Sequence, residues 1–132
     1  MKRIPLALLL LGILLAACAG GSPDLFLDQQ MIDLGEVVNG EIRTIEVSLW
    51  NEGTSDLVIE AVTTSCGCTK AEVSPTTISP GESGELIIEF DSGAHGPEAN
   101  GPIMRQVFVF SNDRDEPQTE FQFTAEVVAK DN

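Results

Sequence analysis

The chain has 132 residues, with 7 Lys and Arg against 21 Asp and Glu, and its formal net charge is −14. At roughly 100–200 residues per domain, this length predicts a single globular unit. The acidity excludes a nucleic-acid binder, because affinity for a polyphosphate depends on clustered basic side chains. One His and no Tyr leave few groups that shuttle protons near neutral pH, so we expect a protein that is not an enzyme.

The N-terminus has the pattern of a targeting segment. Two basic residues precede an apolar run, Ile4–Leu15, which would form a helix of roughly 18 Å against a hydrocarbon core of about 30 Å. Small residues and a Cys follow, as in a secretory signal rather than a membrane span. This segment resembles the lipobox, in which the Cys is the lipidated first residue of the mature protein. We expect residues 1–17 to be removed and Cys18 to carry a covalent lipid; an ordinary signal peptide cut near Ala17 is the alternative.

Lipid, rather than the surface of the domain, would then hold the protein at a bacterial membrane. Without residues 1–17, five basic residues remain against 21 acids, a side-chain charge of −16 that anionic head groups repel. Residues 18–24 are predicted to be the lipidated Cys and a short flexible tether. Ala19, in place of the Asp associated with inner-membrane retention, favours the outer membrane where two membranes exist. The domain would face the periplasm or the outside.

The body of the chain has the pattern of half-buried β-strands. Apolar residues recur at period two, and Val, Ile, Thr and Phe are frequent. The residues predicted to face inward are Ile45, Val47, Leu49, Leu57, Ile59, Ala61, Leu86, Ile88, Phe90, Val107, Val109, Phe121, Phe123, Ala125 and Val127. The fold class is therefore all-β.

Turn residues divide this body into about seven strands, which predicts an immunoglobulin-like β-sandwich over residues 25–128 and a C-terminal tail over 129–132. The segment Ser92–Pro102 is rich in Gly and Pro and long for a connection, so we expect it to be functional or mobile. The acidic turn around Asp113 lacks the spacing of a dedicated Ca²⁺ loop and is predicted to be solvated.

The Cys66-Gly67-Cys68 segment is the one candidate for chemistry. If lipid occupies Cys18, an even pair remains in an oxidising compartment, and Gly67 allows the two cysteines to form a disulfide. Such a small ring would add little entropic stabilisation and would be strained, hence easily reduced. Three interpretations stay open: a local structural disulfide, which we favour, a redox-active dithiol, or a soft-metal site for an ion such as Cu(I).

Neighbouring side chains separate these interpretations. A redox dithiol needs a nearby cation, and Lys70 is the evident one in the sequence. A copper site on Cys66 and Cys68 needs more soft donors, for which His95 and Met104 (or Met31) are available. Contact of Lys70, His95 or Met104 with the cysteines would favour the redox or metal interpretation over the structural one.

Several short motifs recur in a fixed order and point to a family. They are Asp33–Val37, Asn51–Ile59, Ser65–Thr69, Ile78–Glu82, Phe90-Asp91 and Val109–Asp113. The pattern resembles a bacterial family of exported domains of unknown function with a Cys-Gly-Cys-Thr motif, and the immunoglobulin-like domains of the hydin, abnormal-spindle and major-sperm-protein type. The resemblance covers about Leu25 to Val128 and implies an Ig-like fold in the cell envelope. It implies no reaction, and His95 lies in an insertion rather than among family ligands.

Together these features predict a lipid-anchored Ig-like domain that acts as a non-enzymatic binding or structural module in the cell envelope. Its expected partners are the membrane, through the lipid, and another envelope protein. The alternative is a thiol-redox or copper-handling module that uses Cys66 and Cys68, and only this alternative involves a cofactor other than the covalent lipid.

Overall fold

The computed structural model describes residues 20–131; the predicted signal peptide and Cys18 lie outside this range. Within it the chain forms nine β-strands. They are β1 (Leu25–Leu27), β2 (Met31–Val38), β3 (Ile42–Asn51), β4 (Leu57–Thr64), β5 (Thr69–Ser74), β6 (Thr77–Ile78), β7 (Ser83–Asp91), β8 (Gly101–Ser111) and β9 (Gln118–Val128). No helix among these residues is long and apolar enough to cross a membrane.

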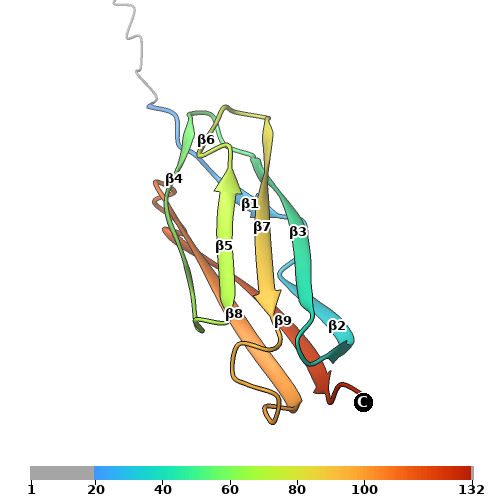
Figure 1. Ribbon diagram of the computed structural model, residues 1–132. Helices are drawn as coiled ribbons and strands as arrows, with labels where there is room; N and C mark the ends of the chain where they lie inside the picture. Colours follow the sequence, from blue (N-terminus) through green and yellow to red (C-terminus); the bar gives the residue numbers. More distant parts are fainter. Residues whose placement is uncertain (1–19, 132) are drawn as a thin grey trace, which may run out of the picture.

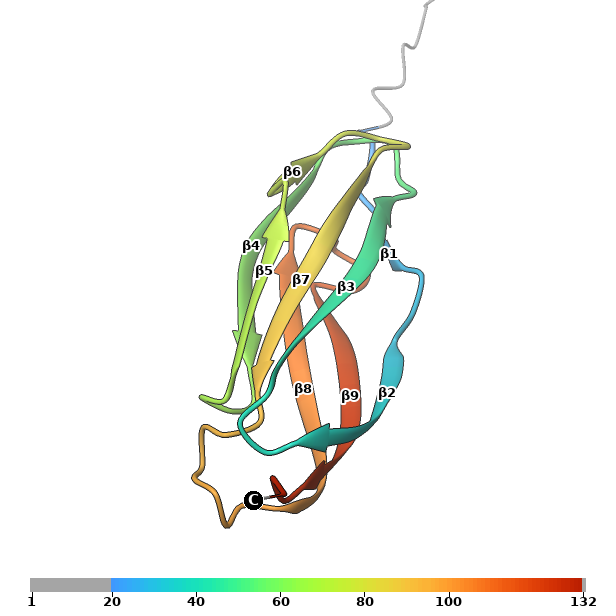
Figure 2. The same ribbon diagram turned by 45° about the vertical axis from the view of Figure 1, so that its right-hand side comes forward.

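The strands form two sheets that pack face to face (Figures 1 and 2). One sheet has the order β1-β3-β7-β5 and the other the order β2-β9-β8-β4-β6. All neighbours are antiparallel except β2 and β9, which run parallel. The predicted β-sandwich is confirmed. The structure has nine strands instead of about seven, because it adds two very short ones, β1 with three residues and β6 with two, that a period-two pattern does not reveal.

The core lies between the sheets and follows the period-two pattern. In β7 the side chains of Leu86, Ile88 and Phe90 are buried, and their neighbours along the strand are exposed or half-buried. Phe90 meets Phe123 of the opposite sheet with ring centroids 5.3 Å apart. Apolar burial of this kind supplies most of the free energy that holds two sheets together.

The prediction for Ala61 is wrong. The pairing of β4 with β8 shifts by one residue between Ile59 and Ala61, and a residue inserted in one strand reverses the faces beyond it. Ala61 is therefore exposed, and Val62 packs against the core in its place.

The turn around Asp113 is not the solvated loop that we predicted. The Asp113 carboxylate is buried and accepts hydrogen bonds from the backbone N–H groups of Leu25, Asp115 and Glu116. Burial acts to raise the pKa of Asp113, but the three N–H donors outweigh it and hold the pKa below its ordinary value. This carboxylate thus fixes the start of β1 to the β8–β9 turn.

The segment before β1 is docked on the domain rather than free. The Ser22 carbonyl accepts a hydrogen bond from Thr54 N–H at 2.8 Å, and the Asp24 carbonyl accepts one from Glu52 N–H at 2.8 Å. A Cβ on Gly53 would collide with the Ser22 carbonyl oxygen, so this close approach requires glycine. The prediction of a flexible tether is wrong for residues 22–24.

The two ends of the sandwich carry different connections (Figure 1). The docked N-terminal segment and the β3–β4 and β8–β9 turns lie at one end. The β2–β3, β4–β5 and β7–β8 connections all cross between the sheets at the opposite end. We call this second end the crossover end; both cysteines of the body and His95 lie there.

Candidate functional site

The Cys66-Gly67-Cys68 segment forms a disulfide in the β4–β5 connection. The two Cα atoms are 5.2 Å apart, inside the range that a disulfide spans. Gly67 faces open space, so nothing crowds the three-residue ring from that side. The predicted pairing of Cys66 with Cys68 is confirmed.

Hydrogen bonds hold the connection without help from the bridge. The Thr69 N–H donates to the Cys66 carbonyl, and Thr64 Oγ1 lies 3.0 Å from the carbonyl oxygens of both residues. Ser65 is tied to β8 twice, through its N–H to the Gln106 carbonyl and through its hydroxyl oxygen to the Gln106 N–H. The turn is therefore closed by its backbone, and the disulfide adds little to its closure.

The two cysteines differ in exposure. Cys68 is only 2% exposed and belongs to the core, directly before the buried Thr69 at the start of β5. Cys66 is half-buried at the rim of the crossover end. The sulfur of Cys66 also accepts a hydrogen bond from the Cys68 N–H at 3.1 Å. One sulfur of the bridge thus belongs to a residue at the rim and the other to a residue in the interior.

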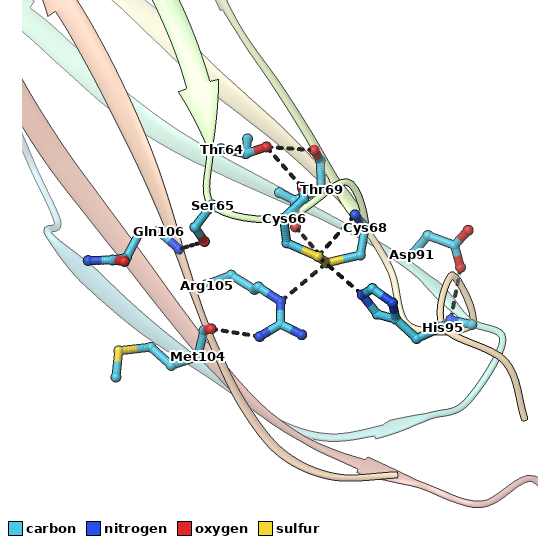
Figure 3. Close-up of a disulfide and its surroundings, with 11 residues drawn as sticks. Thr64, Ser65, Cys66, Cys68, Thr69, Asp91, His95, Met104, Arg105 and Gln106 are labelled. Carbon is cyan, nitrogen blue, oxygen red and sulfur yellow. Dashed lines mark hydrogen bonds between the residues drawn. A yellow bond between two sulfur atoms is a disulfide. The ribbon is translucent and has the colours of Figure 1, made fainter. Parts of the chain in front are cut away.

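His95 lies beside the outer sulfur. Its Nε2 atom is 3.2 Å from Cys66 Sγ, although 29 residues separate the two in the chain (Figure 3). The imidazole comes from the exposed β7–β8 connection, the Ser92–Pro102 segment that the sequence singled out. The contact that would favour a redox or metal interpretation is therefore present.

The segment that carries His95 is held by two buried polar side chains. Asn39 donates from its amide nitrogen to the Gly96 carbonyl at 3.0 Å. Ser92 Oγ donates to the Val38 or the Glu41 carbonyl, at 2.9 and 2.8 Å. These contacts tie the β7–β8 connection to the β2–β3 turn. The long segment is thereby fixed at its base, and His95 projects from it toward the disulfide.

Arg105 lies beside the inner sulfur and was not predicted. Its Nε–H group donates to Cys68 Sγ at 3.2 Å, and Nη1 donates to the Met104 carbonyl at 2.8 Å (Figure 3). The sequence contained a signal for this position. Arg105 is two and four residues before Val107 and Val109, whose side chains face inward, and residues at this spacing in a strand point to the same side. A cavity of about 170 Å³ opens beside His95 and Arg105.

Lys70 and Met104, which we also considered, do not reach the sulfurs. Lys70 is 85% exposed, and its Nζ atom lies 3.7 Å from Glu89 Oε1 on the outer surface of the β5–β7 pair. Met104 is 56% exposed, and its thioether points away from the disulfide (Figure 3). The expectation that Lys70 is the cation near the cysteines is wrong, because strand parity turns it outward; Arg105 takes that place.

The assembled group has two sulfurs, an imidazole and a guanidinium. The two Sγ atoms and a ring nitrogen of His95 lie within 4.8 Å of one another. As a disulfide the sulfurs are poor ligands, but reduction would give two thiolates and an imidazole, which is a donor set suited to Cu(I) or Zn²⁺. After reduction, the Arg105 guanidinium would be in place to donate a charge-assisted hydrogen bond to Cys68 Sγ.

The family described as "Protein of unknown function (DUF1573)" matches residues 25–127. The chain belongs to this family. The resemblance drawn from the Cys-Gly-Cys-Thr motif is confirmed to that extent: it is a family of unknown function, and the match covers the whole sandwich.

Solved structures share the architecture. A protein of unknown function from Porphyromonas gingivalis W83 is 26% identical, with a TM-score of 0.74 over 85% of this chain and 50% of that chain. This chain thus spans about half the length of that protein. The ASH / PapD-like domain 7 of human CEP192 is 15% identical, with a TM-score of 0.61 over 83% of this chain and 89% of that domain. The VesB protease of Vibrio cholerae is 14% identical, with a TM-score of 0.63 over 78% of this chain and 32% of the protease.

The last two likenesses concern the fold alone. No curated protein matches this chain significantly. The function of this DUF1573 domain therefore has to be argued from its own residues.

Proposed function

We propose that this protein is a lipid-anchored protein of the bacterial cell envelope. Its acidic Ig-like domain would act as a non-enzymatic module that binds another envelope protein. The N-terminal pattern of basic residues, apolar run and small residues before Cys18 supports the anchor. Two or three acyl chains, at about 0.8 kcal/mol per buried methylene, suffice for stable attachment. Ala19 after the Cys favours an outer membrane where the source has two.

The N-terminal pattern carries this proposal, and the docking of Ser22–Asp24 on the β3–β4 turn, opposite the crossover end, determines how an anchored domain would be oriented. Three residues between Cys18 and Ser22 span at most about 14 Å, so a lipid on Cys18 would keep this end of the sandwich near the bilayer. The ten residues of β3 extend roughly 33 Å toward the crossover end. An anchored domain would therefore present its crossover end, with the disulfide, away from the membrane.

Replacement of Cys18 tests the anchor. We expect the parent protein to partition into the detergent phase with membranes and Cys18→Ser to appear in the aqueous phase, because the remaining surface is strongly acidic. Cys66→Ser is the matched control, since it removes one thiol and leaves the proposed lipid site intact. Membrane partitioning of Cys18→Ser equal to that of the parent would contradict the proposal.

A second candidate function is supported by the contacts of His95 and Arg105 with the two sulfurs. A purely structural bridge needs neither an imidazole nor a guanidinium. The group is suited to thiol–disulfide exchange or, after reduction, to holding a soft ion such as Cu(I) on Cys66, Cys68 and His95. Met104 is left out of this ligand set because its sulfur points away.

Thiol counting and copper titration test this second candidate. We expect the disulfide to be reduced by glutathione at a potential above about −270 mV, where exchange catalysts operate. The reduced protein should bind one Cu(I), and His95→Ala should weaken that binding. A bridge that resists reduction until below about −300 mV would instead be structural, and this candidate would be rejected.

A further inference from the structure

The disulfide is polarised by its surroundings, and this polarity determines how it would react. Cys66, the half-buried residue, is next to His95, and Cys68, the buried residue, is next to Arg105. In thiol–disulfide exchange one sulfur is attacked and the other leaves as a thiolate. The greater exposure of Cys66 favours attack by an incoming thiolate on Cys66 Sγ. The positive charge of Arg105 favours Cys68 as the thiolate that leaves.

Arg105 supplies the stronger part of this argument. The protein has three times as many acidic as basic residues, yet within residues 20–131 Arg105 makes no ion pair with a carboxylate. Its Nε–H is used on a sulfur of a disulfide, a weak and neutral acceptor. The Arg105 guanidinium pairs with an anion only when the S–S bond opens and Cys68 becomes a thiolate. The two groups are then joined by a charge-assisted hydrogen bond.

His95 is placed for the proton that the incoming thiol must lose. Its Nε2 atom is 3.2 Å from Cys66 Sγ, and its side chain is exposed, so a thiol that approaches Cys66 meets the imidazole. An imidazole nitrogen at this position can accept a proton from a thiol and return it later. The buried Asn39 holds the loop that carries this ring.

We propose that this centre oxidises a dithiol of another exported protein, with Cys66 as the attacked sulfur and Cys68 as the leaving thiolate held by Arg105. The inference rests on the second candidate function. His95 takes the proton of the first partner thiol; the partner thiolate attacks Cys66 Sγ, the S–S bond breaks, and its electron pair remains on Cys68. A mixed disulfide now joins Cys66 to the partner.

The second partner thiol completes the reaction. It loses its proton to solvent and attacks the partner's own sulfur in the mixed disulfide. The partner leaves as a disulfide, and Cys66 takes back the proton held by His95. Two electrons pass from the partner dithiol to the bridge, and the protein ends with a Cys66 thiol and a Cys68 thiolate beside Arg105. The dithiol partner is therefore the reductant in this half-reaction.

Single-cysteine variants test the polarity. In the full-length protein in detergent, Cys68→Ser keeps the outer thiol and Cys66→Ser keeps the inner one. With oxidised glutathione as the probe, we expect Cys68→Ser to form the mixed disulfide at least about tenfold faster, because Cys66 is accessible. Equal rates, or faster reaction of Cys66→Ser, would overturn the assignment of Cys66 as the attacked sulfur.

Charge variants test the role of Arg105. We expect Arg105→Gln to lower the equilibrium constant for reduction by glutathione about tenfold, because the leaving Cys68 sulfur loses a charge-assisted hydrogen bond. Arg43→Gln is the matched control, because this variant also removes one positive charge. Arg43 Nη1 lies 3.9 Å from Glu41 Oε2 and makes no contact with a sulfur. Arg105→Lys should restore most of the effect. If Arg105→Gln behaves like Arg43→Gln, Arg105 does not stabilise the leaving thiolate.

The outcomes separate this inference from the function on which it rests. A disulfide that glutathione does not reduce above about −300 mV rejects the exchange function as a whole. A reducible disulfide with no difference between the cysteine variants, or between the arginine variants, rejects only the polarity proposed here. The cysteine variants leave Arg105 in place, so they decide the polarity even if Arg105→Gln does not fold.

Discussion

Arg105 Nε lies 3.2 Å from Cys68 Sγ, and this contact joins strand β8 to the buried cysteine of a disulfide 37 residues earlier in the chain. His95 makes the corresponding contact with Cys66 on the rim. Two sulfurs of one small ring therefore face different chemical neighbours.

The sandwich core, and not the small ring, should carry the stability of the domain. The double variant Cys66→Ser/Cys68→Ser is expected to lower the free energy of unfolding by about 1–2 kcal/mol, as for an ordinary substitution. Ile88→Ala, at a fully buried position of β7, should cost roughly 2–5 kcal/mol. Urea unfolding under identical buffer conditions measures both. A double variant that does not fold would show that the bridge is structural.

Asn39 should control the order of the segment that carries His95. Asn39→Ala removes the hydrogen bond to the Gly96 carbonyl, so backbone amides of residues 93–100 should exchange with deuterium faster. Asn112→Ala is the matched control, because Asn112 makes similar side-chain bonds to Val58 and Asp56 at the opposite end. Unchanged exchange in residues 93–100 of Asn39→Ala would contradict this role.

Asp113 should make the stability depend on pH in the acidic range. Its pKa in the folded protein is below the ordinary value of 3.8, because its N–H donors outweigh the effect of burial. The contribution of the Asp113 carboxylate to the free energy of unfolding is then complete above about pH 5. It is lost as the pH falls through 3.8 toward the pKa of the folded state.

Two variants test this pH dependence. Asp113→Asn should be less stable than the parent at pH 7 by about 1–3 kcal/mol, and the difference should shrink toward pH 3. Asp115→Asn, at an exposed position of the same turn, is the control for removal of one charge. Urea midpoints at the two pH values give the comparison, and a difference that grows on acidification would contradict the sign.

Gly53 should be required for docking of the N-terminal segment. Gly53→Ala places a Cβ against the Ser22 carbonyl oxygen, so we expect a loss of about 1–3 kcal/mol and faster proteolysis between residues 20 and 25. Gly20→Ala is the control, because a Cβ there meets nothing within 4 Å. Equal proteolysis of the two variants would show that the segment does not depend on this close approach.

The fold class and most of the core could be predicted from the order of the residues alone. Period-two alternation is a local property, and burying one face of each strand leaves few architectures besides a sandwich; this is why Ile88 and Phe123 were assigned correctly. It failed at Ala61, because a bulge changes parity without a distinct residue signature. The pairing of Cys66 with Cys68 was also predictable, since two residues separate them and the loop closes locally.

The neighbours of the two sulfurs, in contrast, depend on how the two sheets pack. His95 lies 29 and Arg105 37 residues from its cysteine, and both reach the disulfide because the β4–β5 and β7–β8 connections cross between the sheets at the same end. Lys70 is two residues from Cys68 in the chain, yet it points to the outer surface of the sheet. Within β5 it alternates with the buried Thr69, and Cys68 lies in the turn before that strand. Closeness in the chain therefore led to the wrong cation. The contacts of the two sulfurs depend on strand parity and on where the connections cross between the sheets, and no local run of residues encodes the crossing.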